Sequence, residues 1–185
     1  MTVPLAISGI DATIVHTPYS STLEPAWSPG TIWRESAATI YRVHTDAGIT
    51  GIGAARGNPD VVANVVGPLL TGVDPARIEP IVRSIINAAG GFAAIPVVAG
   101  IEMALWDLMG KAAGLPLYRL WGAHGSGVRA YASMVEVQTP ERRAEDARRL
   151  LERGYTAIKL RLHDETMRQD IAQVEAVRDA VGDRM

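Results

Sequence analysis

The sequence predicts an α+β domain that is followed by the beginning of a parallel β/α arrangement. Residues 4–55 contain three strand-like segments, and a tight turn at 45–48 joins the last two. Residues 60–112 then carry apolar side chains at helical spacing, which supplies the layer that a small antiparallel sheet needs. After a glycine-rich link at 122–127, strand and helix patterns alternate in units of roughly 30 residues, as in parallel βα repeats.

Composition and charge exclude several classes of protein. Among 185 residues, 48% are hydrophobic and 21% are charged, which is typical of a globular rather than a disordered or fibrous chain. The net charge of −2 argues against binding to nucleic acid or to a membrane surface. The absence of cysteine excludes disulfides, thiolate metal sites and a cysteine nucleophile. Without a signal-peptide pattern or a membrane-spanning run, we expect a cytoplasmic protein.

The N-terminal part of the chain predicts a small antiparallel sheet. Residues 4–17 alternate loosely between apolar and polar side chains and predict the first strand. Residues 18–30 contain three prolines and no helical period, which predicts an irregular loop. Residues 31–45 predict a second strand, and 49–55 are expected to return beside it after the turn.

Helices are predicted after the sheet. Residues 60–70 and 75–87 have helical spacing, with Asp74 as the expected cap and Pro75 as a first-turn residue. The alanine- and glycine-rich residues 88–94 predict a loop.

The strongest helical pattern follows that loop. Gly114 closes this helix, whose predicted apolar face comprises Val98, Ile101, Leu105, Leu108 and Ala112. Residues 115–122 predict a short helical extension. Glu102 and Asp107 face different directions on the helix, so we interpret them as structural rather than as a catalytic carboxylate pair.

The last part of the chain has the pattern strand, helix, strand, helix. Residues 128–135 and 155–162 predict the strands. The first helix is expected to open at Thr139 and to end at Gly154. The second is expected to begin at a cap on Asp164, with an inward face of Ile171, Val174, Val177 and Val181. Two parallel strands cannot form a covered sheet by themselves, so we expect the chain to be truncated.

Three segments resemble one protein family. Residues 100–122 (GIEMALWDLMGKAAGLPLYRLWG) resemble the hallmark helix of the enolase superfamily, in its mandelate racemase/muconate lactonizing enzyme branch. The hairpin at 43–53 (VHTDAGITGIG) is similar to the N-terminal sheet of this family, and 157–162 (AIKLRL) resemble its second barrel strand with a Lys-x-Lys motif. The resemblance implies a capping domain at 1–122, followed at 128–185 by the first two βα units of an incomplete (β/α)8 TIM-like barrel.

The resemblance also implies a chemistry. The family removes the proton α to a carboxylate and uses Mg²⁺ to stabilise the resulting enediolate. The Mg²⁺ ligands are expected beyond residue 185, so no residue of this chain is assigned to the metal. The expected partners are a small-molecule carboxylate substrate and further copies of the same protein, with neither nucleic acid nor membrane.

Lys159 and Arg161 are the candidate catalytic residues. Their side chains point to one face of a predicted strand, opposite to Leu160, near the carboxyl end where barrel enzymes do chemistry. The chain has one other lysine, Lys111, which we interpret as a charge at a helix C-terminus. From spacing alone, solvated strand-end charges are an equal alternative, and the resemblance favours the functional role for Lys159.

Arg161 departs from the family pattern, in which a second lysine often acts as the base. A guanidinium stays protonated at any useful pH, but it can bind a carboxylate through two parallel hydrogen bonds. We therefore expect Arg161 to bind the substrate or the enediolate, and Lys159 to act as electrostatic support or as the base. The main base then comes from beyond residue 185, which favours dehydration of a sugar acid over racemisation, epimerisation or cycloisomerisation.

Four more residues are candidates for substrate binding. Tyr19 and Trp27 lie in the proline-rich loop, and Arg56 follows the third strand, at places where the capping domain of this family covers the substrate. His163 follows Arg161 and is expected at the same rim. The alternatives are exposed loop aromatics and a histidine that only opens the next loop.

The sequence also offers other functional interpretations. Gly51-Ile-Gly53 invites a dinucleotide-binding interpretation, but the tight turn makes the strands antiparallel and Arg56 occupies the place of the third glycine. A non-catalytic binding module and a truncated product remain alternatives. We expect the 185-residue chain by itself to be inactive.

Overall fold

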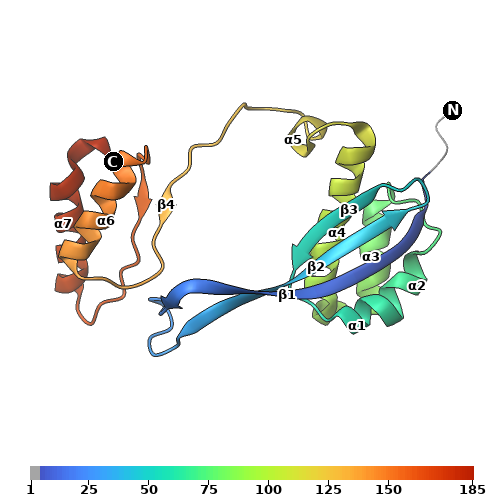
Figure 1. Cartoon of the computed structure of the whole chain (residues 1–185), viewed down its shortest axis with the longest axis horizontal. Helices are drawn as coiled ribbons and strands as arrows, with labels where there is room; N and C mark the ends of the chain where they lie inside the picture. The colour runs from blue at the N-terminus through green and yellow to red at the C-terminus, as the bar shows by residue number, and fades with distance from the viewer. Residues whose placement is uncertain (1–4) are drawn as a thin grey trace. The chain divides into compact units, whose positions relative to one another are not determined.

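The computed structural model describes residues 5–185, and its contacts divide the chain into two compact units (Figure 1). The first unit comprises the N-terminal residues up to Thr17 and Ser36–His124, and the second comprises Pro18–Glu35 and Gly125–Met185. The domain boundaries expected from the sequence, at 1–122 and 128–185, stay a prediction. None of the helices among the described residues is long and apolar enough to cross a membrane.

The predicted antiparallel sheet is confirmed. It has the order β1-β2-β3, formed by β1 (Ile7–Leu23), β2 (Trp33–Thr45) and β3 (Thr50–Ala55). Strands β2 and β3 pair from Thr39 with Ala55 to His44 with Thr50. The predicted loop at 18–30 is wrong in its first part, because β1 continues to Leu23. The predicted start of the first strand at residue 4 lies outside the described residues.

Helices cover this sheet in the first unit. They are α1 (Pro59–Val61), the π-helical turn η1 (Val62–Val66), α2 (Gly67–Leu70), α3 (Ile78–Ala88), the 3-10 turn η2 (Gly91–Ala94), α4 (Ile95–Ala113) and α5 (Leu117–Leu120). The expected helix start at Pro75 is wrong. The Asp74 carboxylate accepts a hydrogen bond from the Ala76 amide at 2.9 Å and so closes a turn ahead of α3.

The core of the first unit lies between the sheet and α4. Ile101, Leu105 and Leu108 are fully buried on α4, as predicted, whereas Ala112 is exposed. Lys111 does more than complement the helix dipole, because its ammonium binds the Asp107 carboxylate at 2.7 Å and the Thr50 carbonyl at 2.8 Å. This contact joins the last turn of α4 to β3.

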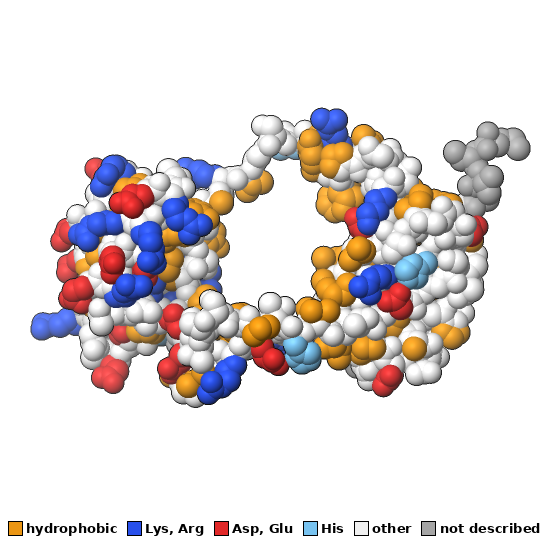
Figure 2. Space-filling model, viewed as in Figure 1, with side chains coloured by type: hydrophobic (Ala, Val, Ile, Leu, Met, Phe, Trp, Pro, Cys, Tyr) orange, Lys and Arg blue, Asp and Glu red, His pale blue; other side chains and the backbone are white. Residues whose placement is uncertain are grey.

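The second unit contains short parallel strands and two longer helices. Its elements are β4 (Ala132–Ser133), α6 (Pro140–Glu152), β5 (Ile158–Lys159), α7 (Met167–Val181) and the 3-10 turn η3 (Gly182–Arg184). Strands β4 and β5 pair in parallel, as predicted, but each is shorter than expected. Figure 2 shows that charged side chains cover much of the visible face of α6 and α7.

Helix α7 differs from the expectation in two ways. Thr166 caps it in a capping box with Gln169, so the predicted cap at Asp164 is wrong. Val177 and Val181 are buried against α6 as predicted, whereas Ile171 is 49% and Val174 44% exposed. The four positions lie on one face of the helix, because steps of three and four residues return to nearly the same direction. Packing covers only the C-terminal end of this face, at Val177 and Val181.

A polar cluster crosses the exposed face of the sheet. The Asp11 carboxylate binds Arg42 at 3.1 Å and His44 at 2.7 Å, and the other ring nitrogen of His44 lies 3.0 Å from the Thr50 hydroxyl. The hydrogen bond with His44 is the main cause that holds the pKa of Asp11 below its usual 3.8; partial burial opposes it and Arg42 reinforces it. A pKa that is lower in the folded state adds stability above the unfolded pKa, and this stability is lost as the pH falls through the folded value.

We predict that Asp11→Asn lowers the free energy of unfolding by about 0.5 kcal/mol near neutral pH, because solvent screens the half-exposed contacts of Asp11 with Arg42 and His44. The difference from the wild type should shrink as the pH falls below 3.8. Urea titrations at several pH values measure both quantities. Glu79→Gln, at an exposed helical pair with Arg83, is the control. A gap between Asp11→Asn and the wild type that widens on acidification would contradict this account.

Candidate active site

The carboxyl ends of β4 and β5 meet at one edge of the second unit. Ser133 pairs with Lys159, and the Met134 amide donates to the Lys159 carbonyl at 3.0 Å. Because the strands are parallel, the segments that follow them, 134–138 and 160–166, start from the same edge. In open and closed α/β sheets, ligands bind at this edge.

Lys159 and Arg161 lie at the end of β5. Ile158 and Leu160 pack against the apolar cluster of α6 and α7, whereas Lys159 is exposed. Side chains alternate along a strand, so Lys159 extends away from the helices, whereas Arg161 lies two residues beyond the end of β5. Arg161 is half-buried, and its Nε donates to the Met134 carbonyl at 3.3 Å.

Trp27 lies against Arg161. The guanidinium carbon is 4.9 Å from the centre of the indole ring, within the range of a cation–π contact. A second ring, Trp33, makes a T-shaped contact with Trp27, with centroids 5.8 Å apart and an angle of 72° between the planes. The structure therefore brings together two residues that were predicted for the site separately, and it adds Trp33, which was not predicted.

Residues 24–32, the loop that carries Trp27, are fastened to the segment after β4. The Ala26 amide donates to the Val135 carbonyl at 3.0 Å, and the Glu24 amide donates to the Glu136 carboxylate at 3.4 Å. The Glu24 carboxylate in turn accepts from the Gly30 amide at 2.6 Å, which closes the loop on itself.

A cavity of about 530 Å³ opens beside this loop. Its lining comes from the loop, from the segments after β4 and β5, and from the first turn of α7: Glu24, Pro25, Ala26, Pro29, Glu136, Val137, His163, Asp164, Glu165 and Gln169. His163 is exposed and belongs to this lining. The predicted rim residue thus lies at the edge that carries Arg161.

A buried arginine of α6 binds the segment that follows β4. Arg143 in α6 is 2% exposed and donates to the Glu136 carbonyl, while its Nε is buried without a hydrogen-bond partner. Burial lowers the pKa of the Arg143 guanidinium below its ordinary value, and Asp146, Glu136 and Asp164 oppose this shift. The group still keeps its charge at neutral pH. Sequence reasoning missed Arg143, although its place four residues before Ala147 puts it on the inward face of the helix.

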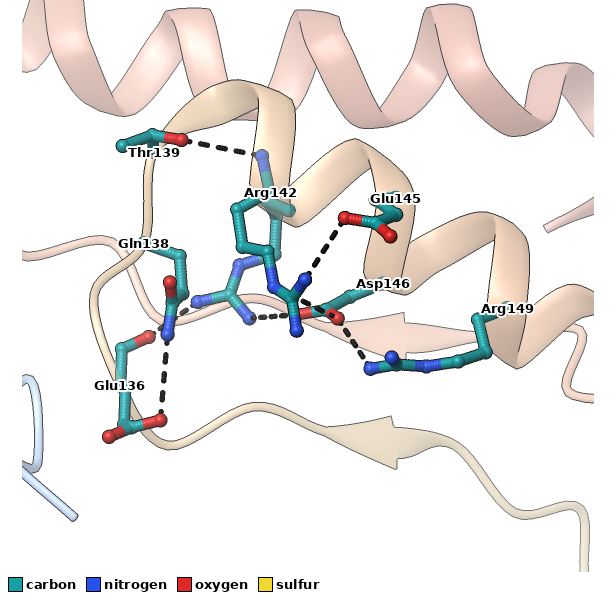
Figure 3. A network of polar contacts seen from close by, with 8 residues as sticks. Glu136, Gln138, Thr139, Arg142, Glu145, Asp146 and Arg149 are labelled. Carbon is teal, nitrogen blue, oxygen red and sulfur yellow. Dashed lines mark hydrogen bonds and ion pairs between the residues drawn. The ribbon is translucent and has the colours of Figure 1, made fainter. Parts of the chain in front are cut away.

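Asp146 is the centre of the charged cluster on α6 (Figure 3). Its carboxylate lies 2.6 Å from Arg149, 3.7 Å from Arg142 and 4.0 Å from Arg143. The partners are three or four residues away on the same helix, which is the spacing of stabilising helical pairs. We assign this cluster to the stability of α6 and not to the site.

The other predicted residues are distributed over both units. Tyr19 lies in the part of β1 that belongs to the second unit and is half-buried. Arg56 belongs to the first unit, where its side chain is exposed beside a groove of about 390 Å³ and its carbonyl accepts from Tyr41 at 3.3 Å. Within the described residues, no group of three histidine or carboxylate side chains is arranged to hold a metal ion.

Comparisons with known proteins give a consistent result. Residues 9–122 match the mandelate racemase / muconate lactonizing enzyme N-terminal domain, and 142–185 match the enolase C-terminal domain-like family. Over 162 residues the chain is 34% identical to D-galactonate dehydratase of Variovorax paradoxus strain S110, which covers 79% of this chain and 42% of that protein.

Two further relatives extend the comparison. The N-succinyl-L-Arg/Lys racemase of Bacillus cereus is 27% identical, over 81% of this chain and 43% of that protein. Among solved structures, a member of the enolase superfamily from Polaromonas sp. JS666 superposes with a TM-score of 0.83 at 32% identity, over 97% of this chain and 50% of that one. The chain thus spans half the length, or less, of these relatives.

Proposed function

Because this chain belongs to the mandelate racemase/muconate lactonizing enzyme family of the enolase superfamily, we propose that it contributes to a sugar-acid dehydratase. The main support is Arg161, which stands where the family often has a second basic lysine and which cannot accept a proton at neutral pH. Most of the matched relatives are sugar-acid dehydratases, D-galactonate dehydratase among them.

The reaction removes the α-proton of the acid and expels the β-hydroxyl group as water. The base takes the α-proton, the electron pair forms the α,β double bond, and the hydroxyl group leaves with a second proton. The enol product then tautomerises to a 2-keto-3-deoxy acid. The difficult step creates negative charge on the carboxylate, so cations placed there stabilise the transition state.

Lys159 and Arg161 supply such cations in this chain. We assign Arg161 to the substrate carboxylate and Lys159 to electrostatic support of the enediolate. The family binds Mg²⁺, which supplies Lewis-acid stabilisation of that charge, but the described residues offer no ligand set for it. The loop around Trp27, with Tyr19 and His163 of the same unit, is proposed to contact the rest of the substrate and to exclude water. Arg56 of the first unit is proposed separately as a substrate-binding residue.

The test uses the longest natural form of the protein, with Mg²⁺ and a panel of sugar acids in D₂O. We expect release of a 2-keto-3-deoxy acid, detected as its semicarbazone, and no turnover by the 185-residue chain alone. Exchange of the α-proton for deuterium without a keto acid would replace dehydratase by racemase or epimerase, as in the Bacillus cereus relative. Turnover by the 185-residue chain would overturn the expectation that it is inactive alone.

A further inference from the structure

Trp27 makes more contacts than an aromatic side chain on an exposed loop requires. Its side chain is 46% exposed, yet the ring lies against the Arg161 guanidinium and makes a T-shaped contact with Trp33. The loop that carries it is fixed by the Ala26 amide on the Val135 carbonyl. The indole is therefore held in place independently of any ligand.

The contacts of Arg161 use only part of its guanidinium. Nε donates to the Met134 carbonyl at 3.3 Å, and the ring of Trp27 covers the group at 4.9 Å. None of the hydrogen bonds found among residues 5–185 uses either terminal nitrogen of Arg161. These two nitrogens form the edge that binds carboxylates in a bidentate manner.

We propose that Trp27 is a positioning residue that acts through Arg161. The indole and the Met134 carbonyl together fix the plane of the guanidinium, so that its two free nitrogens form a preorganised site for a carboxylate. This inference rests on the proposed function for the class of ligand. The inference differs from the proposed function because it assigns Trp27 to the orientation of the Arg161 guanidinium and not to direct contact with the substrate.

The physical reason is conformational. An arginine side chain has many rotamers, and each one that must be frozen on binding weakens the affinity for the ligand. A flat aromatic surface restricts the guanidinium before the ligand arrives, and the attraction of the cation to the ring maintains the contact. An aliphatic side chain at position 27 fills space but does not orient the cation in this way.

The first experiment uses the 185-residue chain and ¹H–¹⁵N NMR of the arginine Nε groups. The Arg161 signal, identified by its loss in Arg161→Lys, should be shifted by the ring current of Trp27. D-gluconate should move this signal further, whereas the neutral polyol D-glucitol should not. Trp27→Leu should remove the ring-current shift and weaken D-gluconate binding about five- to tenfold, and Trp27→Phe should retain most of both.

Trp121→Leu is the matched control, because Trp121 is also exposed but belongs to the first unit and packs on Trp106. It should leave the Arg161 signal and its response to D-gluconate unchanged. If D-gluconate fails to move the Arg161 signal of the wild type, or if Trp27→Leu binds it as the wild type does, the inference is wrong.

Kinetics of the longest natural form separate this inference from the proposed function. Trp27→Leu should raise KM several-fold for a sugar acid and change kcat little, while Trp27→Phe should stay near the wild type. Absence of any keto acid from the wild type rejects the dehydratase, but the NMR result on the carboxylate site stands by itself. An equal loss of kcat and kcat/KM in Trp27→Leu with unchanged KM would instead show that Trp27 acts in the transition state, against the proposal.

Discussion

Gly53→Ala is expected to destabilise the first unit by about 3 kcal/mol, because a methyl group at this position has no room. It would overlap the Gly100 carbonyl oxygen, and it would lie 2.8 Å from the Ala104 amide nitrogen and 3.0 Å from the Cβ of Met103. All three atoms belong to α4. The backbone of a helix cannot rotate out of the way as a flexible side chain does, so α4 must move off β3 and open the core.

Gly9→Ala provides the matched control within the same sheet. Apart from its two chain neighbours, no atom of the described residues lies within 4 Å of a methyl group built on Gly9 in β1, so this change should not destabilise the sheet and should add at most about 1 kcal/mol to the free energy of unfolding. Urea denaturation followed by circular dichroism compares both variants with the wild type. Gly51→Ala should behave like Gly53→Ala, because its methyl group would overlap the Ala104 carbonyl oxygen. Equal stability of Gly53→Ala and Gly9→Ala would show that α4 does not pack on the backbone of β3.

The two glycines illustrate what the sequence can and cannot predict. The place of Gly51 and Gly53 in a strand followed from the turn at 45–48, and the antiparallel pairing of that strand with β2 is confirmed. These two positions require glycine because α4 packs closely against the backbone of β3, and α4 comes much later in the chain. Periodicity within a segment describes the face of that segment, but it does not show which distant backbone will lie against it.

The same limit applies to the candidate site. Alternation along 158–161 predicted that Lys159 and Arg161 extend together. Ile158 and Leu160 are partly buried, but β5 ends at Lys159, so the common direction of the two cations stays a prediction. The contact of Arg161 with Trp27 was not predicted, because a loop with three prolines has no period from which its position can be derived. Local rules failed at Asp164 too: its carboxylate accepts a hydrogen bond from buried Gln173, so Thr166 caps the helix instead.

Lys159→Met is expected to lower kcat/KM of the longest natural form by about 10²- to 10³-fold on a sugar acid. Lys159 is exposed at the carboxyl end of β5, so its ammonium is available to the charge that develops on the substrate carboxylate. Lys111→Met is the matched control, since it removes the chain's other ammonium group, which binds Asp107 and the Thr50 carbonyl in the first unit. Its kcat/KM should stay within about twofold of the wild type at temperatures where the protein remains folded.

Lys159→Arg decides between the two roles that the sequence leaves open for this residue. A guanidinium keeps the positive charge but cannot accept a proton. If Lys159 acts by electrostatics, the kcat/KM of Lys159→Arg should therefore stay within about tenfold of the wild type. General-base catalysis contributes about 10²- to 10⁴-fold, so a lysine base replaced by arginine would be as inactive as Lys159→Met. We expect the result for electrostatic support. Arg161 lies beside Lys159 and cannot accept a proton, so positive charge is the property that the two side chains share. The kcat/KM of Lys159→Arg relative to Lys159→Met therefore measures whether Lys159 is the proton acceptor.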